Sequence, residues 1–249
     1  MGLLGLTVCA ALGQRAFDVA SIRPSEQAGR GRGGHGMGEA FGGNVRVTPD
    51  SVILRGVSLR TCIAWAYHVQ ESLVTGPDWM GDARFDIVAK AAAPADEDHL
   101  RAMMQALLAD RFKVAAHRQT KEMQVYVLEP GKSGAKVHAS ESQGEASIQP
   151  DPRTMTVTVQ RAGVSQLTDL LSRALRAPVL DQTGLAGKYD LTVNVAKYLA
   201  DRQTGGQPLD PISLIEEVLR EELGLKLDSR KLPVDLVVVD RAEKTPTEN

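Results

Sequence analysis

The sequence has few aromatic residues, little net charge and no long apolar run. Only 4% of its 249 residues are aromatic, too sparse for the stacking platforms of proteins that bind single-stranded nucleic acid. The formal net charge is -2, so no overall basic field attracts nucleic acid or an anionic membrane surface. No apolar run approaches the roughly 20 residues of a membrane-spanning helix. We therefore expect no nucleic-acid partner and no membrane span in the mature chain.

Cysteine is almost absent as well. The two cysteines are Cys9, in an N-terminal segment that we expect to be removed, and Cys62. A single remaining cysteine excludes a disulfide framework. Cys62 lies on the apolar side of a helical pattern, and His68, the nearest histidine in sequence, falls on a different face of that helix. We expect Cys62 to be a small buried hydrophobic residue rather than a nucleophile.

Residues 1–13 have the pattern of a secretory signal. An apolar run leads to Ala11-Leu12-Gly13, a small-x-small pattern that allows cleavage before Gln14. No Lys or Arg precedes the run, which suggests that the segment is truncated at its start. A buried first strand or helix is the alternative. We expect an exported protein, either periplasmic or secreted.

What the sequence does contain is a repeat. Four segments place apolar residues at the spacing of amphipathic helices, and Ser58 and Ser165 precede the first and third as expected N-caps. These helical segments are 59–67, 100–108, 167–175 and 215–223. Three pairs of strand-like segments follow them in the same order, 84–87 with 188–191, 112–114 with 225–227, and 123–127 with 234–238.

The repeat predicts an α+β fold with two tandem, diverged copies of a small β-α-β-β-α-β(-β) unit. The helices of each copy are expected to pack on one face of its sheet. The first unit spans 14–130 and includes a Gly-rich loop at 27–43. A linker rich in Gly, Ser, Glu and Pro follows at 131–153, and the second unit spans 154–249. Residues 17–20 are expected to add an edge strand to the first unit.

Two familiar motifs occur in the wrong context. Residues 31–36 match G-x-G-x-x-G, but more glycines and then a strand follow, whereas dinucleotide binding requires the start of a helix. Residues 133–136 match S-x-x-K, but they lie in the linker, where no helix would bring the serine and lysine together. None of the five histidines has a metal-binding spacing. No catalytic, cofactor-binding or metal-binding residue is predicted from motifs.

Asp86 and Asp190 occupy matched positions of the two units. Duplication favours a structural role for both, such as hydrogen bonds at a turn or strand end, over an acid–base pair. One catalytic alternative stays open, an extracytoplasmic hydrolase whose site combines Ser58, Asp86 and His117 or their neighbours. It requires these side chains to meet within hydrogen-bonding reach.

Several sequence blocks resemble those of a bacterial "soil-associated" exported domain family of unknown function. The similarity covers nearly all of the chain from Phe17 onward. The blocks are 17–24, 56–59, 76–79, 84–90, 109–113, 181–185, 187–190 and 242–244. The resemblance implies an export signal and a relation to domains that are sometimes fused to membrane metallopeptidases of the antibiotic-sensor type, but it supplies no catalytic residue. The repeated unit is also similar, in pattern only, to the short N-terminal domain of secretins and TonB-dependent receptors.

Together these observations favour a non-catalytic binding or protein-interaction module outside the cytoplasm. The sensor domain of a membrane signalling system is a further alternative. The expected partner is another envelope protein or a small ligand, held at a sheet edge or in a cleft between the units. The candidate contact residues are Trp79, Tyr126 and Val237, the last two on strands expected to form open edges.

Overall fold

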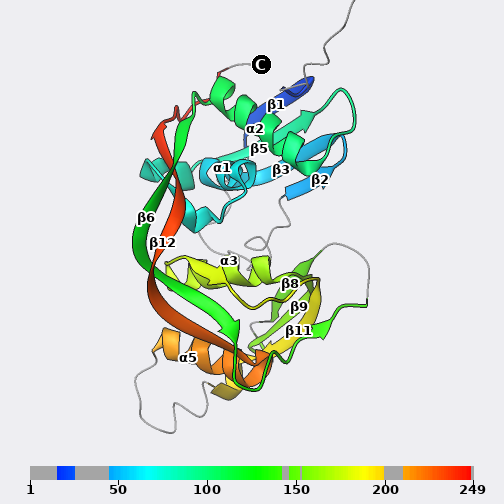
Figure 1. The fold of residues 1–249 in the computed structure, drawn as a ribbon. Helices are drawn as coiled ribbons and strands as arrows, with labels where there is room; N and C mark the ends of the chain where they lie inside the picture. Colours follow the sequence, from blue (N-terminus) through cyan, green and yellow to red (C-terminus); the bar gives the residue numbers. More distant parts are fainter. Residues whose placement is uncertain (1–15, 26–44, 142–145, 152, 199–209, 248–249) are drawn as a thin grey trace, which may run out of the picture.

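The computed structural model describes residues 16–25, 45–141, 146–151, 153–198 and 210–247. It has a mixed α+β fold with two lobes joined by a long two-stranded ribbon (Figure 1). The predicted signal segment 1–13 and the Gly-rich loop 27–43 lie outside the described residues. Within the described ranges, no helix combines the length and apolar character needed to cross a membrane.

The first lobe is a four-stranded antiparallel sheet with two helices on one face (Figure 1). Its strands lie in the order β1-β5-β3-β2, which makes β1 an edge strand as predicted. The strands are β1 (Val19–Pro24), β2 (Val45–Thr48), β3 (Ser51–Ser58) and β5 (Arg84–Lys90). The helices are α1 (Leu59–Tyr67) and α2 (Glu97–Arg111), with 3-10 turns η3 (Glu71–Leu73) and η4 (Asp78–Gly81) between them.

Both helices of the first lobe begin at side-chain caps. The Ser58 hydroxyl accepts a hydrogen bond from the Thr61 N–H at 3.0 Å, which confirms Ser58 as the predicted cap of α1. The Asp96 carboxylate accepts the N–H of His99 at 2.8 Å and starts α2. The helices and the inner face of the sheet then enclose one large apolar core.

The second lobe has a second four-stranded antiparallel sheet, in the order β7-β11-β9-β8. Its strands are β7 (His138–Ala139), β8 (Ser147–Asp151), β9 (Thr156–Ala162) and β11 (Tyr189–Asn194). Its helical segments are α3 (Val164–Leu175), α5 (Pro211–Val218) and the π-helical turn η5 (Leu219–Leu223). In Figure 1, α3 lies above and α5 below in this lobe, with the sheet beside them.

The third sheet links the lobes. Its order is β10-β6-β12-β4, with β6 (Ala115–Pro130), β12 (Leu225–Arg241), β10 (Val179–Asp181) and β4 (Val74–Thr75). Strands β6 and β12 pair antiparallel along almost their full length, and β10 and β4 add to them in parallel. In Figure 1, β6 starts beside the first lobe and ends beside the second, and β12 runs the opposite way.

The strands of the two lobes correspond one to one. The sheet orders β1-β5-β3-β2 and β7-β11-β9-β8 match, and so do the central pairs β4 with β12 and β10 with β6. Helices α1 and α3 both end at a residue in the left-handed region, His68 at φ 55° and Arg176 at φ 51°. This is the arrangement that a tandem repeat predicts, while a common origin of the two halves stays a prediction.

Three local expectations need correction. The segment 131–153, expected to be a linker, contains β7 and β8, which pair into the second sheet. Residues 112–114 do not form a strand, because Lys113 has a φ of 50° and the chain bends there between α2 and β6. Ser165 lies inside the first turn of α3, since the Gln166 side chain accepts the Gly163 N–H and moves the start of the helix to Gly163.

Candidate ligand-binding cavity

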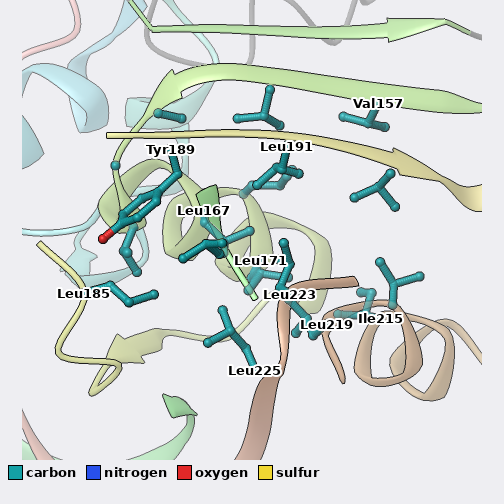
Figure 2. Close-up of a pocket in the computed structure, with 18 of the residues that line it drawn as sticks. Val157, Leu167, Leu171, Leu185, Tyr189, Leu191, Ile215, Leu219, Leu223 and Leu225 are labelled. Carbon is teal, nitrogen blue, oxygen red and sulfur yellow. The ribbon is translucent and has the colours of Figure 1, made fainter. Parts of the chain in front are cut away.

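The second lobe contains an apolar cavity of about 210 Å³ between its sheet and its helices. Figure 2 shows the side chains pointing into one common space from β9 and β11, from α3, and from α5, η5 and the start of β12. The labelled ones are Val157, Leu167, Leu171, Leu185, Tyr189, Leu191, Ile215, Leu219, Leu223 and Leu225.

The sheet side of the cavity follows from strand alternation. Leu191 of β11 lies opposite Val159 of β9, and Val193 lies opposite Val157. Residues two apart on a strand point to the same face, so these four side chains form one apolar surface. All four line the cavity.

The helical side follows from the 3.6-residue period. Val164, Leu167 and Leu171 lie on one face of α3 at spacings of three and four residues, which turns that face toward the sheet. The opposite wall comes from Ile215 of α5 and Leu219 of η5.

Among the described residues, no side chain in the cavity wall has a free polar group. The only side-chain oxygen among the lining residues belongs to Tyr189, and its hydroxyl donates a hydrogen bond to the Ala186 carbonyl at 2.8 Å. Leu167, Leu170 and Ile215 are only half-buried, so the helical wall is not sealed from the surface. An apolar cavity of this kind does not hold water well and can take an apolar molecule instead.

At matched positions the first lobe has bulkier aromatic side chains in its core. There Phe85 and Phe112 pack edge to face, with ring centroids 4.9 Å apart and an interplanar angle of 74°. In the repeat predicted from sequence, Tyr189 and Leu225 stand in their places. Tyr189 is only half-buried, and leucine is smaller than phenylalanine. The second lobe therefore has less side-chain volume to fill a similar frame.

The structure corrects the expected edges at Tyr126 and Val237. β10 pairs with β6 at Tyr126, and the Tyr126 N–H donates to the Pro178 carbonyl at 2.9 Å. Val237 lies opposite Val74 of β4 and is fully buried. Both strands are thus internal at these positions, because short parallel strands cover them. Trp79 is half-buried against the first-lobe core. A contact role for these three residues stays a prediction.

The three residues of the hydrolase alternative each have a different partner. The Ser58 side chain is fully buried and bonds to Thr61. Asp86 accepts the Gly56 N–H at 2.7 Å, and His117 lies exposed on β6 beside Asp240, 2.8 Å from its carboxylate. The described geometry gives no support to a Ser58–His117–Asp86 site.

Asp86 and Asp190 have the structural role expected from the repeat. Asp190 accepts the Arg161 N–H at 2.7 Å, as Asp86 accepts that of Gly56. Gly56 and Arg161 both have positive φ, 58° and 55°, at irregularities where β3 and β9 pair with their neighbours. Each carboxylate thus stabilises a strand irregularity in its own lobe.

Cys62 is buried, as expected, and burial raises the pKa of its thiol to about 12. It is therefore protonated at neutral pH and unsuited to nucleophilic chemistry. Within the described residues, no three His, Cys, Asp or Glu side chains gather in a way that could hold a metal ion.

The apolar spacing of residues 167–175 predicted the helix face that lines the cavity, but not the empty space beside it. A cavity depends on the volumes of all the facing side chains, and those faces are known only once the strands are paired. The signal that the sequence offers for this space is that Tyr189 and Leu225 stand where the first unit has Phe85 and Phe112.

Neither the curated proteins nor the solved structures gave a match to this chain. One family, described as "Protein of unknown function (DUF3738)", matches residues 60–242, which is more than half of the sequence. The resemblance to a family of unknown function is confirmed at that level, while the soil-associated family, its export and the secretin-like similarity stay predictions. The chain belongs to the DUF3738 family.

Proposed function

We propose that this protein is a non-catalytic binding protein that takes a small apolar molecule, or the apolar part of one, into the second-lobe cavity. The observation that carries the proposal is a cavity of about 210 Å³ lined by side chains with no free hydrogen-bonding atom. An engineered apolar cavity of about 150 Å³ is enough to bind benzene, so this one has room for a substituted ring or a short alkyl chain.

The expected affinity of a plain hydrocarbon is modest. Burial contributes about 0.8 kcal/mol per CH₂ group, so a fragment of about six carbons gains roughly 5 kcal/mol before the cost of association. Without that cost, about 5 kcal/mol would correspond to a dissociation constant of about 0.2 mM, and the cost of association weakens binding to the millimolar range or beyond. A natural ligand with higher affinity needs further contacts outside the apolar walls.

The test is a benzene titration followed by NMR of the Leu, Val and Ile methyl groups. We expect saturable shifts at Leu171, Leu191 and Leu223, and none at Leu54 or Leu108 in the closed core of the first lobe. Shifts spread equally over both lobes, or no saturable shift at all, would contradict the proposal.

A cavity-filling variant sharpens this test. Ala162 is buried and lines the cavity, so Ala162→Leu should reduce the benzene shifts strongly. Val88→Leu enlarges a side chain that is 43% exposed in the first lobe, and it should leave them unchanged. Equal benzene binding in both variants would place the ligand elsewhere.

We also propose that the protein acts outside the cytoplasm. The support is the apolar run and the small-x-small pattern that ends at Gly13. The proposal predicts that the chain recovered from a periplasmic or culture fraction begins at Gln14. Recovery of the uncleaved chain from the cytoplasm alone would overturn it.

A further inference from the structure

A second, polar hollow of about 190 Å³ adjoins the cavity at the edge of β11. Leu191, Val193 and Leu223 line both spaces and therefore form their common wall. The remaining side chains of the hollow are polar or charged: Lys136, His138, Asp190, Thr192 and Glu222.

The hollow exists because the chain next to β11 pairs with it only briefly. β7 is bonded to β11 at Tyr189 and Asp190, whereas in the first lobe β1 covers β5 from Phe85 to Lys90. The residues before β7 are held elsewhere, since the Lys136 N–H donates to the Leu223 carbonyl of η5 at 2.7 Å. A gap is thus left beside β11, next to the cavity wall.

The acidic groups at this hollow already have partners. Asp190 accepts the Arg161 N–H, and this backbone bond is the main reason that the pKa of its carboxyl is lowered. Glu222 accepts the Tyr198 hydroxyl at 2.6 Å, and Lys197 is 3.8 Å from the same carboxylate oxygen.

The hydrogen-bond donors at the hollow have fewer partners than the acidic groups. The Lys136 ammonium donates to the Glu221 carbonyl at 3.2 Å, and an ammonium carries two further N–H groups. His138 is exposed at the rim, and its ring can donate one hydrogen bond even when neutral. A ligand group placed here is therefore best recognised through acceptor oxygens.

The charge balance favours an uncharged acceptor. With Lys136 at +1 and both Asp190 and Glu222 at -1, the side chains that line the hollow sum to -1, and Lys197 beside Glu222 brings the sum to zero. A ligand carboxylate would meet two like charges within this small space, which is unfavourable. A carbonyl oxygen accepts the same hydrogen bonds without that repulsion.

We propose that the ligand is amphiphilic, with its hydrocarbon part in the cavity and an ester or amide carbonyl in the hollow, where Lys136 and His138 donate to it. The inference rests on the proposed function and adds the polar half of the ligand. Leu191, half-buried in the common wall, is the side chain that the ligand would have to pass between the two spaces. The added hydrogen bonds supply affinity that the apolar walls alone lack.

Three probes with the same phenylpropyl core test the inference, and pentylbenzene, which is as long as the methyl ester, controls for the apolar contribution of the additional O-methyl group. Propylbenzene, methyl 3-phenylpropanoate and 3-phenylpropanoate are titrated into the full-length chain, with binding followed by methyl NMR. We expect the ester to bind about three- to tenfold more tightly than either hydrocarbon, and the carboxylate to bind more weakly than the ester. Equal affinity of the ester and pentylbenzene, or tightest binding of the carboxylate, overturns the inference.

Variants separate this inference from the proposed function. Lys136→Met keeps the apolar stem but removes one of the two donors, so it should reduce the preference for the ester while the affinity for propylbenzene, which does not use the hollow, stays the same. Lys132→Met removes a nearby exposed charge that does not line the hollow, and it should change neither. If propylbenzene fails to bind the wild-type chain, the proposed function falls. If Lys136→Met leaves the ester preference undiminished, only the further inference falls.

Discussion

The two lobes share one strand order but differ in how their interiors are filled. In the first lobe the core includes an aromatic pair and the fully buried Met80. In the second, matched strands and helices surround a cavity of about 210 Å³. Strand order and helix placement are thus compatible with either a solid or a hollow lobe, and side-chain volume decides between them.

The lobes also differ in the link between their first helix and the central sheet. The first lobe has the extra turn η3 there, and this turn packs against α3 of the second lobe. Just before η3, the Gln70 amide donates to the Val179 carbonyl at 2.8 Å and to the Thr168 hydroxyl at 3.1 Å. Gln70 and the residues of η3 therefore contribute to the contact between the lobes rather than to the core of either lobe.

Removal of a large core side chain should show the difference in packing between the two lobes most clearly. Phe112→Ala empties a fully buried site in the solid core and should lower the free energy of unfolding by about 3–5 kcal/mol. Leu225→Ala should cost about 2 kcal/mol, because that side chain already faces empty space on one side. Urea denaturation followed by circular dichroism measures both, and equal losses would mean that the second lobe is as tightly packed as the first.

Adding volume should have opposite effects in the two lobes. Ala89→Leu forces extra carbons into the closed core and should destabilise the protein by about 1–3 kcal/mol. Ala162→Leu fills existing space and should stabilise it by about 1 kcal/mol. The same denaturation experiment checks the signs. Destabilisation by both variants would argue against open space in the second lobe.

The matched carboxylates should behave alike. Asp86→Ala and Asp190→Ala each leave one backbone N–H at a strand irregularity without its acceptor. We expect each variant to lose about 1–2 kcal/mol of stability. Thermal unfolding of the two variants side by side makes the comparison, and a large effect in one lobe only would break the structural equivalence.

The smallest expected effect is a pH dependence of stability, which arises at the contact between the two lobes. Burial, with Glu71 adding to it and Arg173 opposing it, raises the pKa of Asp169 on α3 from 3.8 to about 6. The folded state thus holds more protons than the unfolded state between these values, so stability falls as pH rises from about 4 to 6 and levels off above. Asp169→Asn should remove roughly 1 kcal/mol of this fall, allowing for its partial exposure.

Unfolding of Asp169→Asn is measured by urea denaturation at several pH values between 4 and 7. Asp82→Asn, which removes an exposed carboxylate in the first lobe, serves as the control and should leave the slope unchanged. An unaltered slope in Asp169→Asn would show that Asp169 titrates normally.

Local patterns in the sequence predicted the elements well, because caps and periodicity are local. Ser58 caps α1 as expected, and Asp86 and Asp190 have matching bonds. The pairing of strands distant in sequence was not predictable in this way. Nothing near Tyr126 or Val237 indicates that β10 and β4 pair beside them. The cavity was out of reach for the same reason, since its walls come from stretches far apart in the sequence, 137, 157–171, 185–195 and 214–225.

The antiparallel pairing of β6 and β12, which brings the end of β12 to the first lobe, affects how the chain folds during synthesis. Val237 and Val239, close to the C-terminus, are part of the first-lobe core. A ribosome releases the rest of that lobe long before these two residues, so the nascent first half cannot complete its interior until β12 has been synthesised. Such non-local closure favours slow, cooperative folding of the whole chain. Proteolytic removal of the last strand should then unfold both lobes together.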